Sequence, residues 1–189
     1  MRKIVAFAHQ TLDGYAASNE GMGLEWTSRA YDDELAAYAA HIQEDFDLPV
    51  YGRETYLGMS EYWGAQPTEE STDTERAHAE WVNAVSKIVV STTLESADWS
   101  NTRLVRGNLA EEFGRLRETE GGTIAIYGSP KLVHSFLAEG LIDEFRIVVH
   151  PIVIGGGTPL FPAGTKLGLD RVESRVFASG ATYLRLSVA

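Results

Sequence analysis

Four short segments of this sequence carry glycine, hydroxyl and charged side chains of the types that bind phosphate groups and small charged ligands. They are Thr11-Leu12-Asp13-Gly14, Gly52-Arg53-Glu54-Thr55, Ser91-Thr92-Thr93 and Gly128-Ser129. Glycine lets the backbone approach a ligand, hydroxyls bond to phosphate oxygens, and an arginine side chain grips them as a planar fork. The segments therefore predict a binding site for a phosphate-bearing small molecule.

The segment at Gly128 carries the clearest signal for a phosphate. The apolar stretch Thr123–Tyr127 predicts a buried strand, and Ser129 and Pro130 suit the N-cap and the first position of a helix. The free N–H groups and the positive dipole end of that helix would face a ligand beside Gly128. An ordinary strand-turn-helix connection is the alternative interpretation.

Arg53 and Thr55 lie at the start of a second expected helix, and Ser91 and Thr92 follow a neighbouring expected strand. Together these side chains can hold a terminal phosphate, although a solvated position is the alternative for Arg53. With the separate turn at Gly128 they predict a nucleotide with two phosphate positions. No Gly-x-Gly-x-x-Gly or Walker pattern is present.

Asp13 is the carboxylate that we expect to handle a proton or to contact a substrate. It follows the first expected strand, whereas the phosphate-binding turns follow other strands. An Asp before a Gly often forms a turn instead, and Asp32, Asp33 and Glu34 are alternative sources of the carboxylate.

His9, Thr11 and Trp26 are expected to bind the substrate near this carboxylate. A core position is the alternative for Trp26. The five histidines show no metal-ligand spacing, so no metal site is predicted. His150 precedes Pro151 within an expected strand and is interpreted as structural.

Alternating helix and strand patterns must bring these segments together. Helical spacing of apolar residues, with caps at Thr72 and Asn108, predicts helices over residues 31–46, 52–63, 73–85, 108–116 and 130–137. Strand patterns cover residues 3–9, 48–51, 87–91, 104–105, 123–127 and 144–154, and residues 172–188 alternate around Gly180 like an antiparallel hairpin. The glycine run at 155–157 leads to no helix and is interpreted as a loop or bulge.

This order of elements predicts an α/β fold with three layers, α-β-α, and a mainly parallel mixed sheet that ends in an antiparallel hairpin. Ligands of such sheets bind at the carboxyl ends of the strands, where all four segments would lie. The fold thus predicts that residues far apart in the sequence share one site.

Composition limits the classes of protein that this chain can represent. Its 189 residues, 44% of them hydrophobic, suit a single domain over residues 1–189 with one full core. The formal net charge of -11 argues against nucleic acid or an anionic membrane as a partner. No apolar run reaches the roughly 18 residues of a membrane span, and the lack of cysteine suits a reducing compartment, so we expect a cytoplasmic protein.

Six motifs occur in order along nearly the whole chain. They are Leu12-Asp13-Gly14-Tyr15, Gly52-Arg53-Glu54-Thr55-Tyr56, Val89-Val90-Ser91, Tyr127-Gly128-Ser129, Leu141-Ile142-Asp143-Glu144 and the segment from His150 to Phe161. Together they resemble the dihydrofolate reductase superfamily, in particular stand-alone proteins similar to the C-terminal reductase domain of the riboflavin-biosynthesis protein RibD. The resemblance implies a dihydrofolate reductase-like fold.

The resemblance also implies an NADPH-dependent reductase that transfers a hydride to a C=N or C=O of a small heterocycle. The family substrate is the ribosylaminopyrimidine reduced by a 5-amino-6-(5-phosphoribosylamino)uracil reductase. The resemblance also implies where the cofactor binds. Arg53 and Thr55 would lie near the adenosine phosphate, with Ser91 and Thr92 beside them and Gly52 in the same set. Gly128 and Ser129 would lie at the pyrophosphate, and Gly14, in the loop with Asp13, near nicotinamide and substrate.

Three functions therefore remain open. No residue from His9 to Glu25 is Lys or Arg, which disfavours a phosphorylated substrate for the reductase. A dihydrofolate or pterin reductase is the second alternative and would require a carboxylate on a helix. A non-catalytic nucleotide-binding regulatory protein is the third.

A homodimer built through the C-terminal strands is a further implication of the resemblance. Residues 147–149 and 152–154, extended by Leu160 and Phe161, form an apolar run that would be an aggregation hazard if exposed. We therefore expect a twofold homodimer that covers this run.

Overall fold

A mixed β-sheet forms the middle layer of the structure, a computed structural model that describes residues 1–19 and 23–189. Its strands are β1 (Ile4–Thr11), β3 (Phe46–Gly52), β4 (Lys87–Val90), β5 (Thr102–Val105), β6 (Thr123–Tyr127), β7 (Glu144–His150), β9 (Leu169–Val176) and β10 (Thr182–Val188). The spatial order is β5-β4-β3-β6-β1-β7-β10-β9. The first six strands in this order are parallel, and the last two form the predicted antiparallel hairpin.

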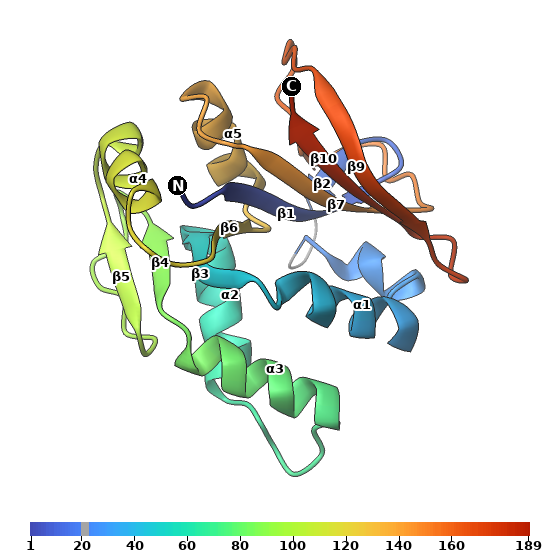
Figure 1. The fold of residues 1–189 in the computed structure, drawn as a ribbon. Coiled ribbons are helices and arrows are strands. Elements are labelled where there is room, and N and C mark those ends of the chain that lie inside the picture. Colours follow the sequence, from blue (N-terminus) through green and yellow to red (C-terminus); the bar gives the residue numbers. More distant parts are fainter. Residues whose placement is uncertain (20–22) are drawn as a thin grey trace.

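Helices cover both faces of the sheet (Figure 1). The helices are α1 (Asp33–Gln43), α2 (Arg53–Gly64), α3 (Asp73–Ala84), α4 (Leu109–Arg117) and α5 (Pro130–Ala138). Phe113 of α4 and Phe136 of α5 pack on one face of the sheet, and Leu35 and Ile42 of α1 pack on the other, where α3 also lies. The three-layer α-β-α fold is therefore confirmed. Within the described ranges, no helix is both long and apolar enough to span a bilayer.

Local signals in the sequence account for where several helices begin. The side chain of Asp32 accepts a hydrogen bond from the N–H of Leu35 at the start of α1. Thr72 and Glu75 form the predicted capping box of α3, and Asn108 caps α4 as predicted. These caps satisfy N–H groups that a helix leaves without partners in its first turn.

A second, two-stranded sheet lies at the carboxyl ends of β1 and β7. Its strands are β2 (Tyr15–Ala17) and β8 (Thr158–Pro159), which pair antiparallel. The N–H of Leu160 bonds to the carbonyl of Gly14 at 3.0 Å, which ties the two segments together. Strands of 3 and 2 residues are too short to show a periodic pattern, so the sequence does not predict them.

Two predicted elements extend well past the observed ones. The sequence pattern predicts a helix that includes Phe46, but α1 ends at Gln43 and Phe46 opens β3, where it pairs with Thr123. Ile42 and Phe46 belong to the same core cluster, so their helical spacing reflects shared burial from two different elements. The strand predicted to continue to residue 154 ends at His150, because the following Pro151 has no N–H to continue the ladder.

The apolar run that suggested a dimer is mostly covered within one chain. Ile147 and Val148 lie in the middle of the sheet between β1 and β10, and Leu160 is fully buried. Within this apolar run, Val153 is a large hydrophobic residue that is clearly exposed, with a fractional exposure of 65%. The aggregation argument for the homodimer therefore does not hold, and the homodimer remains a proposal that rests on the resemblance.

Candidate functional site

The carboxyl ends of β4, β3, β6, β1 and β7 lie in that order along one edge of the sheet. Four of these ends carry the segments singled out in the sequence, at Ser91, Gly52, Gly128 and Thr11. Neighbouring strands are about 4.8 Å apart, so the line from the end of β4 to the end of β1 spans roughly 14 Å. The fold thus places the four segments side by side, in an order that an extended ligand can follow.

The turns at Gly52 and Gly128 are joined directly. The N–H of Gly52 donates to Oγ of Ser129 over 2.9 Å, and that hydroxyl donates to the carbonyl of Tyr127 over 3.2 Å. A Cβ at Gly128 would lie 3.7 Å from Cγ2 of Thr55, so α2 begins against this turn. Gly128 has a φ of +60°, a conformation that favours glycine.

Ser129 was predicted to cap α5 with its side chain, but it does not. It occupies the N-cap position with a φ of +50°, and its side chain makes no capping hydrogen bond. The Ser129 hydroxyl instead accepts a hydrogen bond from the N–H of Gly52, the last residue of β3. Pro130 does occupy the first turn of the helix, as predicted.

A cleft of about 880 Å³ opens between α2 and the loop that follows β4. Arg53, Thr93 and Leu94 are among its lining residues. Ser91 shapes the loop, because its Oγ accepts hydrogen bonds from the N–H groups of Thr93 at 3.2 Å and Leu94 at 3.0 Å. Thr92 is exposed and does not line the cleft.

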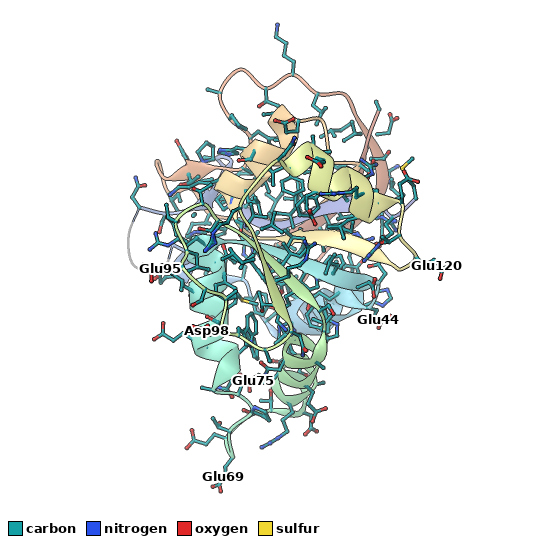
Figure 2. All side chains as sticks on the ribbon, turned by 90° about the vertical axis from the view of Figure 1, so that its left-hand side faces the viewer. Glu44, Glu69, Glu75, Glu95, Asp98 and Glu120 are labelled. Carbon is teal, nitrogen blue, oxygen red and sulfur yellow. The ribbon has the colours of Figure 1, made fainter. Side chains whose placement is uncertain are left out.

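Acidic side chains share the wall of this cleft. Glu61, Glu95 and Asp98 line it, whereas Arg53 is the basic residue found there among the described parts of the chain. Figure 2 shows Glu95 and Asp98 on the side of α2. Arg106, which no sequence pattern singles out, holds this loop by donating to the carbonyl oxygens of residues 94 and 95 at 2.6 and 2.7 Å. The cleft therefore presents one guanidinium amid an acidic surface.

Asp13 joins the loop after β1 to the loop after β7. Its carboxylate accepts hydrogen bonds from the N–H groups of Gly155 at 2.8 Å and Ile154 at 3.2 Å. The bond from the Thr11 side chain, and then those from Gly155 and Ile154, lower the pKa of Asp13 below its ordinary value. Asp13 is exposed and stays ionised at neutral pH, while Thr11 is fully buried and its hydroxyl also accepts from the N–H of Tyr15.

His9 and His150 meet at the ends of β1 and β7. Nδ1 of His9 lies 2.8 Å from Nε2 of His150. Burial, and to a smaller extent His150, lowers the pKa of His9 to about 3, and burial lowers the pKa of His150 to about 4. Both rings are therefore neutral at neutral pH. The sequence predicts His9 near the site but does not identify His150 as its partner, because 141 residues separate them.

Trp26 connects this pair to a second cleft. It lies on the 3₁₀ helix η1 (Glu25–Arg29), its ring packs edge-on against His150 at 5.2 Å, and its Nε1 donates to the carbonyl of Gly23 at 2.8 Å. The cleft, of about 560 Å³, is also lined by residues 154–156, the loop that Asp13 holds. Trp26 is 9% exposed, so it serves both as core and as cleft wall.

The alternative carboxylates Asp32, Asp33 and Glu34 lie at the start of α1, and two of them already bind other groups of the protein. Asp32 caps the helix, and Glu34 pairs with Arg175 at 2.9 Å, whereas Asp33 is exposed. In the described ranges, no group of three or more His, Asp or Glu side chains is arranged to hold a metal ion. Asp13 lies just beyond the end of β1, on the edge of the sheet where the glycine turns lie.

Comparison with known proteins assigns the chain to a family. The family model of the RibD C-terminal domain matches residues 2–183. The uncharacterized protein YyaP of Bacillus subtilis is 31% identical over 185 residues, which cover 97% of this chain and 93% of that protein.

Two solved structures share the fold. A protein from Shewanella sp. PV-4, provisionally assigned to riboflavin biosynthesis, superposes with a TM-score of 0.78 at 23% identity and covers 99% of both chains. Dihydrofolate reductase from Enterococcus faecalis in complex with NADP(H) superposes with a TM-score of 0.62 at 14% identity, covering 98% of this chain and 96% of that chain. The fold is therefore dihydrofolate reductase-like, and the protein belongs to the RibD C-terminal domain family.

Proposed function

We propose that this protein is an NADPH-dependent reductase that transfers a hydride to a C=N or C=O of a small heterocycle. The observation that carries the proposal is the alignment of the turns at Gly52, Gly128 and Thr11 along one edge of the sheet, beside the cleft that Arg53 lines. The cofactor supplies the hydride, and the protein supplies binding and orientation. Family membership supports the same class of reaction.

The residues at this edge fit the proposed cofactor. Gly128 leaves open the space that a side chain would occupy against Thr55, but its own N–H donates to the carbonyl of Phe7 at 2.8 Å. The N–H groups that would approach a pyrophosphate are therefore those at the start of α5, beginning with that of Ser129. Arg53 would pair with the adenosine phosphate at the outer end of the cleft.

The substrate would bind at the ends of β1 and β7, beyond the nicotinamide. His9 and Trp26 are the side chains that would contact it, and Asp13 lies at the adjoining loop. No Lys or Arg lies between His9 and Glu25, so we propose an unphosphorylated heterocycle of the pyrimidine type rather than a sugar phosphate. Asp13, ionised at neutral pH, would accept a hydrogen bond from a ring or amino N–H while it also accepts from the backbone of the loop after β7.

Gly128→Ala, compared with Gly140→Ala, tests the cofactor site. Both glycines have a φ near +60°, at +60° and +62°, so alanine introduces similar backbone strain of about 1 kcal/mol at each. Gly140 lies after α5, away from the turns that form the site. By calorimetry we expect Gly128→Ala to weaken NADPH binding more than about tenfold and Gly140→Ala to leave it unchanged.

Turnover is then measured with NADPH and a panel of pyrimidine and pterin acceptors. Failure of the wild-type protein to bind NADPH, or equal binding by wild type and Gly128→Ala, would contradict the proposal. NADPH binding without oxidation by any acceptor would favour the regulatory alternative. Oxidation by dihydropterins alone would favour the folate-type alternative.

A further inference from the structure

The imidazoles of His9 and His150 form a hydrogen bond in which one ring must donate and the other accept. The two nitrogens are 2.8 Å apart, Nδ1 on His9 and Nε2 on His150. A neutral imidazole carries one proton, so the choice of donor fixes the protonation of all four nitrogens. The pair therefore exists in one of two arrangements, and these differ in what His9 offers to a ligand.

Aromatic side chains surround the pair. Phe7 and Tyr31 contact the ring of His9 at centroid distances of 5.6 and 5.7 Å, and Trp26 contacts His150 at 5.2 Å. Among the described residues, no carboxylate forms an ion pair with either ring. Apolar burial without a counter-charge disfavours an imidazolium, so the two rings share a single hydrogen bond between neutral forms.

The surroundings of His150 decide between the two arrangements. His150 is 1% exposed, and its Nδ1 is buried and has no hydrogen-bond partner in the described chain. A proton on that nitrogen would be a buried donor with no acceptor, which is rarer in proteins than a buried acceptor with no donor. The proton of His150 therefore sits on Nε2 and is donated to Nδ1 of His9. A neutral His9 must then carry its own proton on Nε2.

We propose that His9 presents this Nε2–H to the substrate as a fixed hydrogen-bond donor and that His150 is the positioning residue that holds it in this tautomer. The inference deepens the proposed function and rests on it. His9 is only partly buried, at the end of β1 between the Gly128 turn and the Trp26 cleft. A donor at this place selects a heterocycle that turns a carbonyl oxygen or a bare ring nitrogen toward β1, and disfavours one that turns an amino group there.

The tautomers are measured directly, without any ligand, by nitrogen-15 NMR of the histidine rings at pH 7. We expect both His9 and His150 to carry the proton on Nε2. A proton on Nδ1 of either ring would overturn the inference. This readout does not depend on cofactor or substrate, so it separates the inference from the proposed function.

Two substitutions of His150 separate positioning from packing. His150→Gln places an amide nitrogen about where Nε2 lies and can still donate to His9, whereas His150→Leu fills the space and cannot donate. We expect the Nε2–H tautomer of His9 to persist in His150→Gln and to become mixed with the Nδ1–H form in His150→Leu. Equal tautomer populations in both variants would contradict a positioning role.

Selectivity is measured by calorimetry on protein saturated with NADPH, with 5,6-diaminouracil and its 2-thio and 4-thio analogues as matched probes. Each analogue replaces one ring carbonyl oxygen by sulfur, a weaker hydrogen-bond acceptor, and keeps both ring N–H groups. We expect wild type and His150→Gln to prefer the dione over one of the two analogues by about tenfold, and His150→Leu to lose most of this preference. Normal NADPH binding with no preference in the wild type would overturn the inference and leave the proposed function standing. A preference that persists fully in His150→Leu would also overturn it.

Discussion

The backbone N–H of Gly52 donates to Oγ of Ser129 over 2.9 Å and so joins two turns that lie 77 residues apart in the chain. One turn begins α2 and the other begins α5. The hydrogen bond fixes the spacing between the two positions at which the proposed cofactor would contact backbone. Ser129 adopts a φ of +50° to make it, a conformation that a serine rarely adopts without compensation.

Ser129→Ala should lower the free energy of unfolding by about 1–2 kcal/mol, because the N–H of Gly52 loses its acceptor while the backbone strain remains. Ser129→Gly removes the strain as well, so we expect a smaller loss of stability but the same loss of NADPH affinity. Ser135→Ala on the exposed side of α5 is the control and should change neither. Urea unfolding and calorimetry measure the two effects, and unchanged NADPH affinity in both Ser129 variants would contradict the role given to this bond.

The sequence predicted the order of strands and helices well, because burial periodicity and helix caps are local signals. The capping box of Thr72 and Glu75 and the cap at Asn108 were recognised from residue type and spacing alone. The sequence pattern places Phe46 in the helix because it follows Ile42 by four residues, which is helical spacing. Phe46 in fact lies in β3 and packs in the same core cluster as Ile42 of α1. The spacing of buried residues along the chain therefore does not reveal whether a helix or a strand carries a given buried side chain.

Contacts across the sheet were not predictable from spacing. His150 was interpreted as structural, and its contact with His9 follows only once β7 is known to lie beside β1. The same neighbours bury Ile147 and Val148, which removed the reason to expect an exposed apolar run. Ser129 was predicted to cap α5, and a long-range bond to Gly52 outcompeted that local one.

Arg53→Ala should weaken NADPH binding by about tenfold or more and leave NADH binding almost unchanged, because a charge-assisted phosphate bond is worth about 1.5–3 kcal/mol. Arg53 lines the outer cleft, where the adenosine phosphate distinguishes the two cofactors. Arg171→Ala on β9 removes an exposed arginine elsewhere and serves as the control for net charge. Equal losses for NADPH and NADH in calorimetry would assign Arg53 a role other than phosphate binding.

Glu95→Gln should tighten NADPH binding by about twofold at low ionic strength, because it removes a negative charge near the expected phosphate. The gain should shrink as salt is added, since the interaction runs through solvent. Glu120, which lies on a different part of the surface in Figure 2, provides the control Glu120→Gln. A gain of the same size in the control would mean that only net charge matters.

The free energy of unfolding should fall as the pH is lowered from about 6.5 toward 4, because three buried or partly buried histidines must then take up protons on unfolding. Burial lowers the pKa of His9, His78 and His150 to about 3, 4 and 4, from an ordinary value of 6.5. The unfolded chain therefore binds more protons than the folded chain in this range, and full stability is present above it. Each group contributes at most about 1.4 kcal/mol per pH unit.

His78 isolates one of these contributions, because its ring makes tilted contacts with Trp63 and Trp81, apart from His9 and His150. His78→Phe keeps an aromatic ring and should make the pH dependence of urea unfolding between pH 6.5 and 5 less steep. His41, whose side chain is 67% exposed, offers the matched control His41→Phe. An unchanged slope in His78→Phe would show that its ring is not held in a neutral form by burial.

Asp13→Asn separates the charge of this residue from its hydrogen bonds to the loop. Asparagine keeps one side-chain oxygen that can accept from the N–H of Gly155, so the loop after β7 should stay in place. It removes the negative charge that would accept a hydrogen bond from the substrate. With any acceptor that supports turnover we expect kcat to fall by about a hundredfold, since a charge-assisted hydrogen bond is worth about 1.5–3 kcal/mol, and NADPH affinity to stay within about threefold.

Asp13→Ala is the companion variant, since it removes the hydrogen bonds to Ile154 and Gly155 together with the charge. If Asp13 acts through its charge, Asn and Ala should lose turnover to a similar extent, although only Ala should lower the melting temperature. If Asp13 acts only by holding the loop, Asn should retain nearly wild-type turnover and Ala should not. That second outcome would return Asp13 to a turn-forming role and move the search for the substrate-facing carboxylate to Asp33, which is exposed at the start of α1.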